Sequence, residues 1–260
     1  MIIRKGAAEI ERIARAGDLV AATIAHVGER IEPGISTAEL DDIADAFIHA
    51  QGGTSTSRGY RGYPAAICIS PNEVVVHGIP GSYRVAEGDI VTIDVGATLD
   101  GAIADSAYTY AVGELEPGVQ RLLDVCKDAL WAGIAEARVG NRVGDVSHAI
   151  QTVVEGAGFS VIRSLVGHGV GRHYHEDPHV PNFGEPGRGP KLSEGMTIAI
   201  EPMITMGSAE VVLDEDGWTI STEDGSLAAH FEHTVAVLAS GPRVLTPRVG
   251  VAKETTRLLQ

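Results

Sequence analysis

The sequence predicts an α+β fold with a mostly antiparallel sheet, and three observations support this prediction. Two pairs of helical segments each precede strand-like segments, an order that does not favour a doubly wound parallel sheet. The stretch around Asp100-Gly101 has the alternation and the turn residues of an antiparallel hairpin. The segments that begin at Gly34 and Gly140 align at an offset of 106 residues, which indicates an internal duplication.

Composition restricts the class of protein. The 260 residues suffice for one large domain or two small ones, and the formal net charge is −15 at pH 7. This charge leaves no basic surface for phosphates, so nucleic acid is not expected as a substrate. The N-terminus becomes polar too early for a signal peptide, and no apolar run is long enough for a membrane span. Two cysteines, Cys68 and Cys126, make no disulfide framework and favour the reducing cytoplasm.

Four helices are expected. The first covers residues 7–28, where apolar residues recur at three- and four-residue steps. The second begins at Ser36, which forms a capping-box pattern with Glu39, and it ends at a Gly-Gly pair. The third follows Pro117, and the fourth ends at the glycine-containing turn 156–158.

The hairpin from Ile90 to Ala107 places two acids together. Asp100-Gly101 is typical of a type I′ turn, because both central residues of that turn need positive φ. With this turn, Gly96 pairs with Asp105, and Asp94 becomes a diagonal neighbour of Asp105 on the same face. Two carboxylates directed at one point repel each other unless a cation lies between them. Two solvated acids on an exposed face are the alternative.

A second group of candidates lies between the second helix and this hairpin. A short apolar strand is expected over residues 65–70, within a loop-rich stretch of the kind that often forms binding surfaces. His77 follows the apolar run 74–76 directly. A single histidine at a strand end is more typical of a structural residue than of a functional one.

The second half of the chain holds a histidine-rich segment. Four histidines occur within a dozen residues, and glycines flank the first of them: His168, His173, His175 and His179. Flanking glycines let the backbone approach a ligand closely. The spacing matches neither a zinc finger nor an HExxH helix, so a metal site and a solvated loop both stay open.

Two acids occur in apolar stretches. Glu201 is the one charge in the run MTIAIEPMITM, and Glu232 stands at the head of another apolar strand. A carboxylate buried in this way costs several kcal/mol unless it is paired, protonated or bound to a metal. A salt bridge to an arginine could explain one such acid but explains several poorly.

Together these observations give five candidate donors, four carboxylates and one imidazole. Five donors are too many for one hydrolytic zinc ion, whereas two divalent cations about 3.5–4 Å apart would use all of them. Oxygen-rich ligands with one histidine suit Mn(II), Fe(II), Co(II) or Zn(II), and the lack of thiolates argues against a structural zinc. An iron oxygenase triad needs two histidines and one carboxylate, the opposite ratio.

Five motifs resemble the type I methionine aminopeptidases in order and separation: VVVHGIP, TIDVGATLDGAIADSA, GHGVGRHYHEDP, TIAIEPM and FEHTVAV. The resemblance covers about residues 2–245. It implies the pita-bread fold, with two pseudo-symmetric halves and a curved antiparallel sheet flanked by helices. It also implies one catalytic domain over residues 1–260 without an N-terminal extension. The implied reaction removes an N-terminal methionine before a small second residue, by attack of a dimetal-activated hydroxide on the first peptide bond.

The resemblance implies a set of metal ligands: Asp94, Asp105, His168, Glu201 and Glu232. In that family pattern Asp94 chelates one ion with both oxygens, and Asp105 and Glu232 bridge the two ions. His168 and Glu201 then bind the other ion, and Glu201 is also the candidate proton shuttle to the departing amine. The implied cofactors are two divalent ions per chain, Co, Mn, Fe or Zn.

The resemblance also implies substrate contacts. His77 and His175 match histidines that contact the substrate and stabilise the tetrahedral intermediate. The positions that match the methionine pocket are Tyr60, Tyr63, Cys68, Tyr174 and Trp218. Aromatic edges and a thiol suit a polarizable thioether, although ordinary core packing is the alternative for the aromatic residues. His173 and Tyr174 stand where the family more often has glycine and phenylalanine.

The implied partners are the N-termini of nascent polypeptides, met at the ribosome by a cytoplasmic monomer without a nucleic-acid substrate or a membrane. Two alternatives keep the fold. A related peptidase of X-Pro specificity would keep the metals and change the pocket. A non-catalytic binding member would be expected to have lost ligands, and here all five are present.

Overall fold

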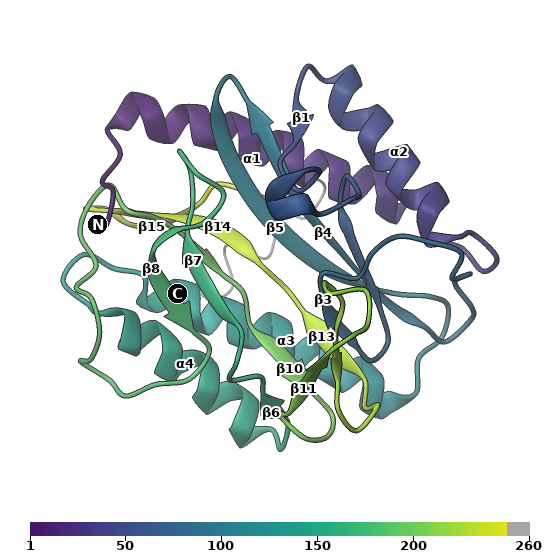
Figure 1. Ribbon diagram of the computed structural model, residues 1–260. Helices are drawn as coiled ribbons and strands as arrows, with labels where there is room; N and C mark the ends of the chain where they lie inside the picture. The colour runs from purple at the N-terminus through teal and green to yellow at the C-terminus, as the bar shows by residue number, and fades with distance from the viewer. Residues whose placement is uncertain (249–260) are drawn as a thin grey trace.

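The computed structural model describes residues 1–248 and confirms an α+β fold, since every strand pair in that range is antiparallel. Figure 1 shows one helix pair, α1 and α2, on the upper side and the other, α3 and α4, on the lower side, with strands between them. Within residues 1–248, no helix has the length and apolar character needed to cross a membrane.

The helices of the first half form as predicted. Helix α1 (Ala7–Gly28) buries its apolar face against the sheet, and α2 (Thr37–Ala50) begins after a complete capping box. The Ser36 hydroxyl accepts from the Glu39 amide at 3.2 Å, and the Glu39 carboxylate accepts from the Ser36 amide at 2.9 Å. These contacts satisfy amides that have no partner within the helix.

The helices of the second half repeat this arrangement. After α3 (Pro117–Glu136), α4 (Val143–Gly156) has the same 14-residue length as α2 and starts 106 positions later. The preceding turns also match, since Gly34 and Gly140 have φ of 99° and 103°. The alignment of the two segments therefore reflects a real structural repeat.

The sheet of the first half is centred on the hairpin. Strand β4 pairs with three others, and the four strands are β1 (Thr54–Ser55), β2 (Cys68–Pro71), β4 (Ile90–Leu99) and β5 (Ala102–Ala111). Asp100 and Gly101 have φ of 51° and 72°, and Gly96 pairs with Asp105 as predicted. The two acids of the hairpin are thus diagonal neighbours across β4 and β5.

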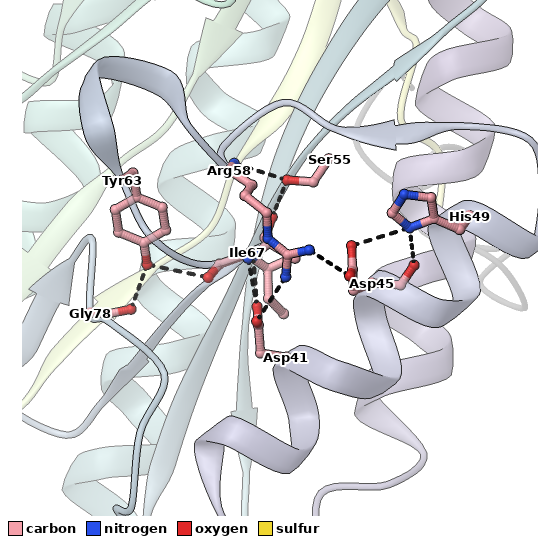
Figure 2. Close-up of polar contacts among 9 residues, drawn as sticks. Asp41, Asp45, His49, Ser55, Arg58, Tyr63, Ile67 and Gly78 are labelled. Carbon is pink, nitrogen blue, oxygen red and sulfur yellow. Dashed lines mark hydrogen bonds and ion pairs between the residues drawn. The ribbon is translucent and has the colours of Figure 1, made fainter.

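One strand prediction is wrong at its start. The strand expected over 65–70 begins only at Cys68, because the amides before it have another partner. The amides of Ala66 and Ile67 both donate to Oδ1 of Asp41 on α2, each at 2.9 Å, instead of to a neighbouring strand (Figure 2). This contact fixes the loop before β2 against α2.

The sheet of the second half has the order β15-β14-β9-β7-β8. Its strands are β7 (Val166–Gly169), β8 (Glu176–Pro181), β9 (Thr197–Ile200), β14 (His233–Leu238) and β15 (Gly241–Val244). The apolar run around Glu201 is two strands rather than one, because β9 ends at Ile200 and β10 begins at Met203.

Two smaller sheets and a 3-10 turn complete the described fold. One sheet joins β13 (Ala228–His230), β10 (Met203–Thr205) and β6 (Ser160–Val161), and the other joins β11 (Val211–Leu213), β12 (Ile220–Thr222) and β3 (Val74–Val76). The turn η1 (Tyr60–Gly62) lies in the loop before β2.

Strands β5 and β14 join the two halves. The Thr234 hydroxyl accepts from the Asp105 amide at 3.0 Å and donates to the Asp105 carbonyl at 2.8 Å. The Glu232 amide donates to the carbonyl of Ala107 at 3.0 Å. These contacts fix the backbone of one acid from each half side by side.

Candidate metal centre and substrate pocket

The five predicted ligands come from five separate places in the fold. Two lie on the hairpin and three in the second half: Asp94 on β4, Asp105 on β5, His168 on β7, Glu201 between β9 and β10, and Glu232 just before β14. His168 Nε2 is 3.7 Å from Asp105 Oδ2 and 3.5 Å from Glu201 Oε1. Ligand atoms of Asp105, His168 and Glu232 all lie within 4.8 Å of one another. The structure therefore brings donors from both halves to one point.

The carboxylates of this cluster are buried and incompletely hydrogen-bonded. Asp105, Glu201 and Glu232 have exposed fractions of 5%, 9% and 2%. In each of the four acids one buried oxygen has no hydrogen-bond partner: Asp94 Oδ1, Asp105 Oδ1, Glu201 Oε1 and Glu232 Oε1. Buried polar atoms in folded proteins almost always have a partner. Four such oxygens in one cluster fit divalent cations as the missing partners.

The protonation equilibria of the acids reflect the same burial. Burial raises the pKa of Asp94 to about 7 and raises the pKa of Asp105 well above its usual range, with the Asp94 charge adding to the effect. Burial and then the hairpin carboxylates raise the pKa of Glu201 and Glu232 in the same way. Arg248 lowers the pKa of Glu232, but burial and the neighbouring acids outweigh it. The ionised cluster therefore needs more positive charge than these neighbours supply.

His168 is arranged as a neutral ligand. Burial lowers the pKa of its imidazole to about 4. Its Nδ1 lies 2.9 Å from the Gly169 carbonyl, a contact that assigns the proton to Nδ1. Nε2, which faces Asp105 and Glu201, is then the free lone pair, as is usual for a metal-binding histidine.

An arginine salt bridge does not account for Glu201. Its ion-pair distances within residues 1–248 are to imidazoles, 3.5 Å to His168 and 3.8 Å from Oε2 to His230 Nε2. Burial lowers the pKa of both imidazoles, so neither supplies a positive charge near neutral pH. A cation from outside the protein chain remains the simplest compensation.

Sequence reasoning missed His230. This side chain is 2% exposed, neither ring nitrogen has a hydrogen-bond partner, and Nε2 faces Glu201. Its signal in the sequence was a second polar residue two positions before Glu232, the spacing that places side chains on one face of a strand. Three of the histidines singled out in the sequence, His173, His175 and His179, are instead exposed.

The predicted substrate residues adjoin this cluster through two groups of rings. The His175 ring lies 4.1 Å from the His168 ring and stacks on Tyr60 at 5.1 Å. Tyr174 meets the Tyr60 ring edge-on, also at 5.1 Å. These three residues form a wall beside His168.

The second group of rings consists of Tyr63, His77 and Trp218. Trp218 meets Tyr63 edge-on at 5.2 Å and His77 at 6.4 Å. Cys68 packs in the same apolar cluster as Tyr63 and Trp218, and it pairs with Asp94 across β2 and β4. Cys68, on the apolar side of the candidate pocket, is therefore the cross-strand neighbour of Asp94, a predicted metal ligand.

The Tyr63 hydroxyl ties this second group to the His77 loop. It contacts the Gly78 carbonyl at 2.9 Å and the Ile67 carbonyl at 3.2 Å (Figure 2). His77 itself has φ of 58°, a left-handed conformation that is rare for residues other than glycine. Residues in such conformations cluster at functional sites.

Tyr174 has a polar partner that the sequence did not indicate. Its hydroxyl lies 3.0 Å from the hydroxyl of Ser57, and both residues are buried. The same hydroxyl packs over Gly96, where an added Cβ would come within 2.4 Å of it. A glycine in β4 is therefore required by the Tyr174 ring, since its Cζ and Cε2 would also lie 2.5 and 2.6 Å from the added atom.

Comparison with known proteins agrees with this geometry. Residues 11–239 match the model of metallopeptidase family M24. The chain is 50% identical over 246 residues to a methionine aminopeptidase of Clostridium perfringens, covering 95% of this chain and 99% of that protein. It is 48% identical over 246 residues to methionine aminopeptidase 1 of Bacillus subtilis, with the same coverage.

Solved structures give the same result for the fold. The crystal structure of methionine aminopeptidase from Rickettsia prowazekii superposes with a TM-score of 0.94 at 38% identity, covering 95% of this chain and 100% of that chain. A prolidase from Pyrococcus furiosus superposes with a TM-score of 0.78 at 21% identity, covering 95% of this chain and 66% of that chain. At that identity the likeness to the prolidase concerns the fold alone.

Proposed function

Because the chain belongs to metallopeptidase family M24, we propose that it is a methionine aminopeptidase that removes N-terminal methionine before a small second residue. The observation that carries this proposal is the convergence of Asp105, Glu201 and Glu232 on the neutral His168, with Asp94 beside Asp105 on the hairpin and one unpartnered buried oxygen in each acid. Identity near 50% over almost the whole length of the named relatives supports the substrate class.

We propose that two divalent ions are held by Asp94, Asp105, His168, Glu201 and Glu232. Bound there, the ions supply Lewis acidity, which polarises the scissile carbonyl and makes water acidic enough to act as a nucleophile at neutral pH. The burial of Asp105, His168, Glu201 and Glu232, and of Oδ1 of the half-buried Asp94, supports this assignment, because a water-excluded site strengthens each of these electrostatic effects.

The protein's own groups have distinct proposed tasks. Glu201 accepts a proton at a carboxylate oxygen and returns it to the departing amine nitrogen, as general acid–base catalysis requires. His77 and His175 donate hydrogen bonds to the carbonyl oxygen as negative charge develops on it. The contact of the His175 ring with His168 and its stacking on Tyr60 support this task for His175, and the left-handed backbone of His77 supports a functional role for that residue.

The methionine side chain is proposed to lie against Tyr60, Tyr63, Cys68, Tyr174 and Trp218. Ring edges and a thiol offer the polarizable surface that favours a thioether. Burial raises the pKa of the Cys68 thiol well above its usual range, so this residue is a neutral wall rather than a nucleophile.

A peptide panel tests the proposal. Purified protein supplied with Mn(II) or Co(II) should release methionine from Met-Ala-Ser and leave Met-Leu-Ser largely intact. Ala-Pro peptides, which an X-Pro peptidase would cut, serve as the specificity control. Equal cleavage of the two methionine peptides, or no cleavage with either metal, would refute the assignment.

We also infer that residues 1–260 act as one catalytic domain, as a monomer in the cytoplasm, on nascent chains at the ribosome. The contacts between β5 and β14 and the packing of Tyr108 against both main cores support a single unit. Both cysteines are free and buried, as expected in a reducing compartment. Sedimentation of the protein alone and with ribosomes would measure the oligomeric state and the association.

A further inference from the structure

The loop that presents Tyr174 and His175 is attached to the first residues of the chain. Three ion pairs join residues 1–9 to residues 172–177: Met1 with Asp177 at 2.5 Å, Lys5 with Glu176 at 2.6 Å, and Glu9 with Arg172 at 2.5 Å. The partners in each pair are more than 160 positions apart in sequence. The N-terminal segment is therefore joined to this loop on both sides of Tyr174 and His175.

The pair in the middle differs from the other two. The side chains of Lys5 and Glu176 are 1% and 2% exposed, whereas Met1 and Asp177 are 102% and 50% exposed. A surface pair contributes little, but a buried charge that loses its partner is strongly unfavourable. Lys5 and Glu176 are thus the pair on which the attachment depends.

Glu176 also binds the backbone of the loop. One of its oxygens, Oε2, contacts Lys5, and the other, Oε1, accepts from the amides of Arg172 and His173 at 2.7 and 2.9 Å. The Gly171 amide closes the same turn by donating to the His173 carbonyl. The backbone just before Tyr174 and His175 is therefore held by one carboxylate that Lys5 fixes in place.

We propose that Lys5 and Glu176 are positioning residues that keep loop 171–175 in the conformation that contacts the substrate. Glu176 orients the backbone, and Lys5 orients and neutralises Glu176. This inference rests on the proposed function, in which Tyr174 and His175 contact the peptide, but the ordering of the loop can be measured without it.

Two double variants separate positioning from stability. In Lys5→Met/Glu176→Leu an apolar pair replaces the ions, which preserves packing but leaves the Arg172 and His173 amides without their acceptor. In Lys5→Met/Glu176→Gln the side-chain carbonyl still accepts from these amides. Asp177→Asn, which breaks the neighbouring exposed pair, is the matched control.

The readouts are amide hydrogen exchange of residues 171–175, the melting temperature, and kcat/KM on Met-Ala-Ser. The Met/Leu variant should melt near the wild type, yet its loop amides should exchange about ten-fold faster and kcat/KM should fall about ten-fold, as expected for hydrogen bonds to a charged group. The Met/Gln variant keeps the acceptor for the two amides but loses the Lys5 contact, so it should lie between the wild type and the Met/Leu variant in both measurements. Asp177→Asn should stay within about two-fold of the wild type.

The outcomes distinguish this proposal from the proposed function. Loop exchange and kcat/KM within about two-fold of the wild type in the Met/Leu variant would overturn the positioning role. A wild-type protein that does not cleave the peptide would overturn the proposed function, while faster exchange in the Met/Leu variant alone would still support the attachment of the loop.

Discussion

The two halves of this protein share a helical frame but supply their proposed ligands differently. Helices α2 and α4 have the same length and the same preceding turn at an offset of 106 residues. The first half contributes both of its acids from one hairpin, Asp94 on β4 and Asp105 on β5. The second half contributes His168, Glu201 and Glu232 from three strands or strand ends. A local turn sets the first pair, whereas sheet topology sets the other three.

This difference decides what the sequence could predict. The hairpin register followed from Asp100-Gly101, because turn type alone fixes which residues pair. The bounds of α1 and the capping box of Ser36 and Glu39 also followed from rules that act within a few residues. The convergence of the second-half donors does not follow from spacing; it was inferred from the cost of burying several acids and from the family resemblance.

The wrong start of β2 and the omission of Ser57 and His230 have one physical origin, which is contact between residues distant in sequence. Strand β2 starts late because Asp41, a residue of α2, accepts from two amides that would otherwise pair in a sheet. Ser57 and His230 gain their roles only from Tyr174 and Glu201, which are distant in sequence. A contact between elements far apart leaves no periodic pattern in the chain.

The most damaging single change should be in the second half. Glu201→Gln removes the proposed proton carrier and should lower kcat on Met-Ala-Ser by about 10²- to 10⁴-fold, the usual contribution of a general acid–base group. Steady-state kinetics at saturating Mn(II) measure this effect. Glu223→Gln, at an exposed acid, is the control and should keep wild-type turnover. Wild-type turnover in Glu201→Gln would remove this residue from the mechanism.

Metal removal should reveal how much the buried acids of the cluster reduce the free energy of unfolding. In the metal-free protein the pKa of Asp94 is raised to about 7, so the folded state binds more protons than the unfolded state between about pH 4 and pH 7. The contribution of Asp94 to the free energy of unfolding should therefore fall as pH rises through this window, on the order of a few kcal/mol. The lowered pKa values of the buried His168 and His230 imidazoles act in the opposite direction below about pH 6.5, so the Asp94 contribution is measured against a variant that lacks it.

Urea denaturation of chelated protein at several pH values measures this loss, and saturating Mn(II) should remove most of it. Asp94→Asn is the matched control, because it lacks this titrating group, so its stability relative to the metal-free wild type should increase as pH rises through the window. Equal pH dependence of the metal-free wild type and Asp94→Asn would contradict the electrostatic account of the cluster.

A smaller effect should come from the contact between the hairpin and the histidine loop. Gly96→Ala places a methyl carbon 2.4 Å from the Tyr174 hydroxyl oxygen, and overpacking of this kind costs about 1–3 kcal/mol. Thermal unfolding and kcat/KM should both decline. Gly156→Ala, where an added Cβ meets no atom within 4 Å, should leave both almost unchanged. Equal behaviour of the two variants would show that the hairpin and the loop are not tightly packed.

The smallest predicted effect compares the two repeated helices directly. Ser36→Ala removes a side-chain cap from α2 and should reduce the free energy of unfolding by about 1 kcal/mol. Arg142 occupies the matching position before α4 but makes no side-chain cap, so Arg142→Ala should cost clearly less. Urea midpoints of the two variants test the difference, and an equal or larger loss in Arg142→Ala would contradict it.

The central claim is that carboxylates from both halves and His168 hold two divalent ions. Diffraction from Mn(II)-soaked crystals, with data collected at the manganese absorption edge, tests this claim most directly. We predict two anomalous peaks about 3.5–4 Å apart, within coordination distance of Asp94, Asp105, His168, Glu201 and Glu232. Saturated crystals without peaks at this cluster, or with manganese bound only elsewhere, would contradict the claim.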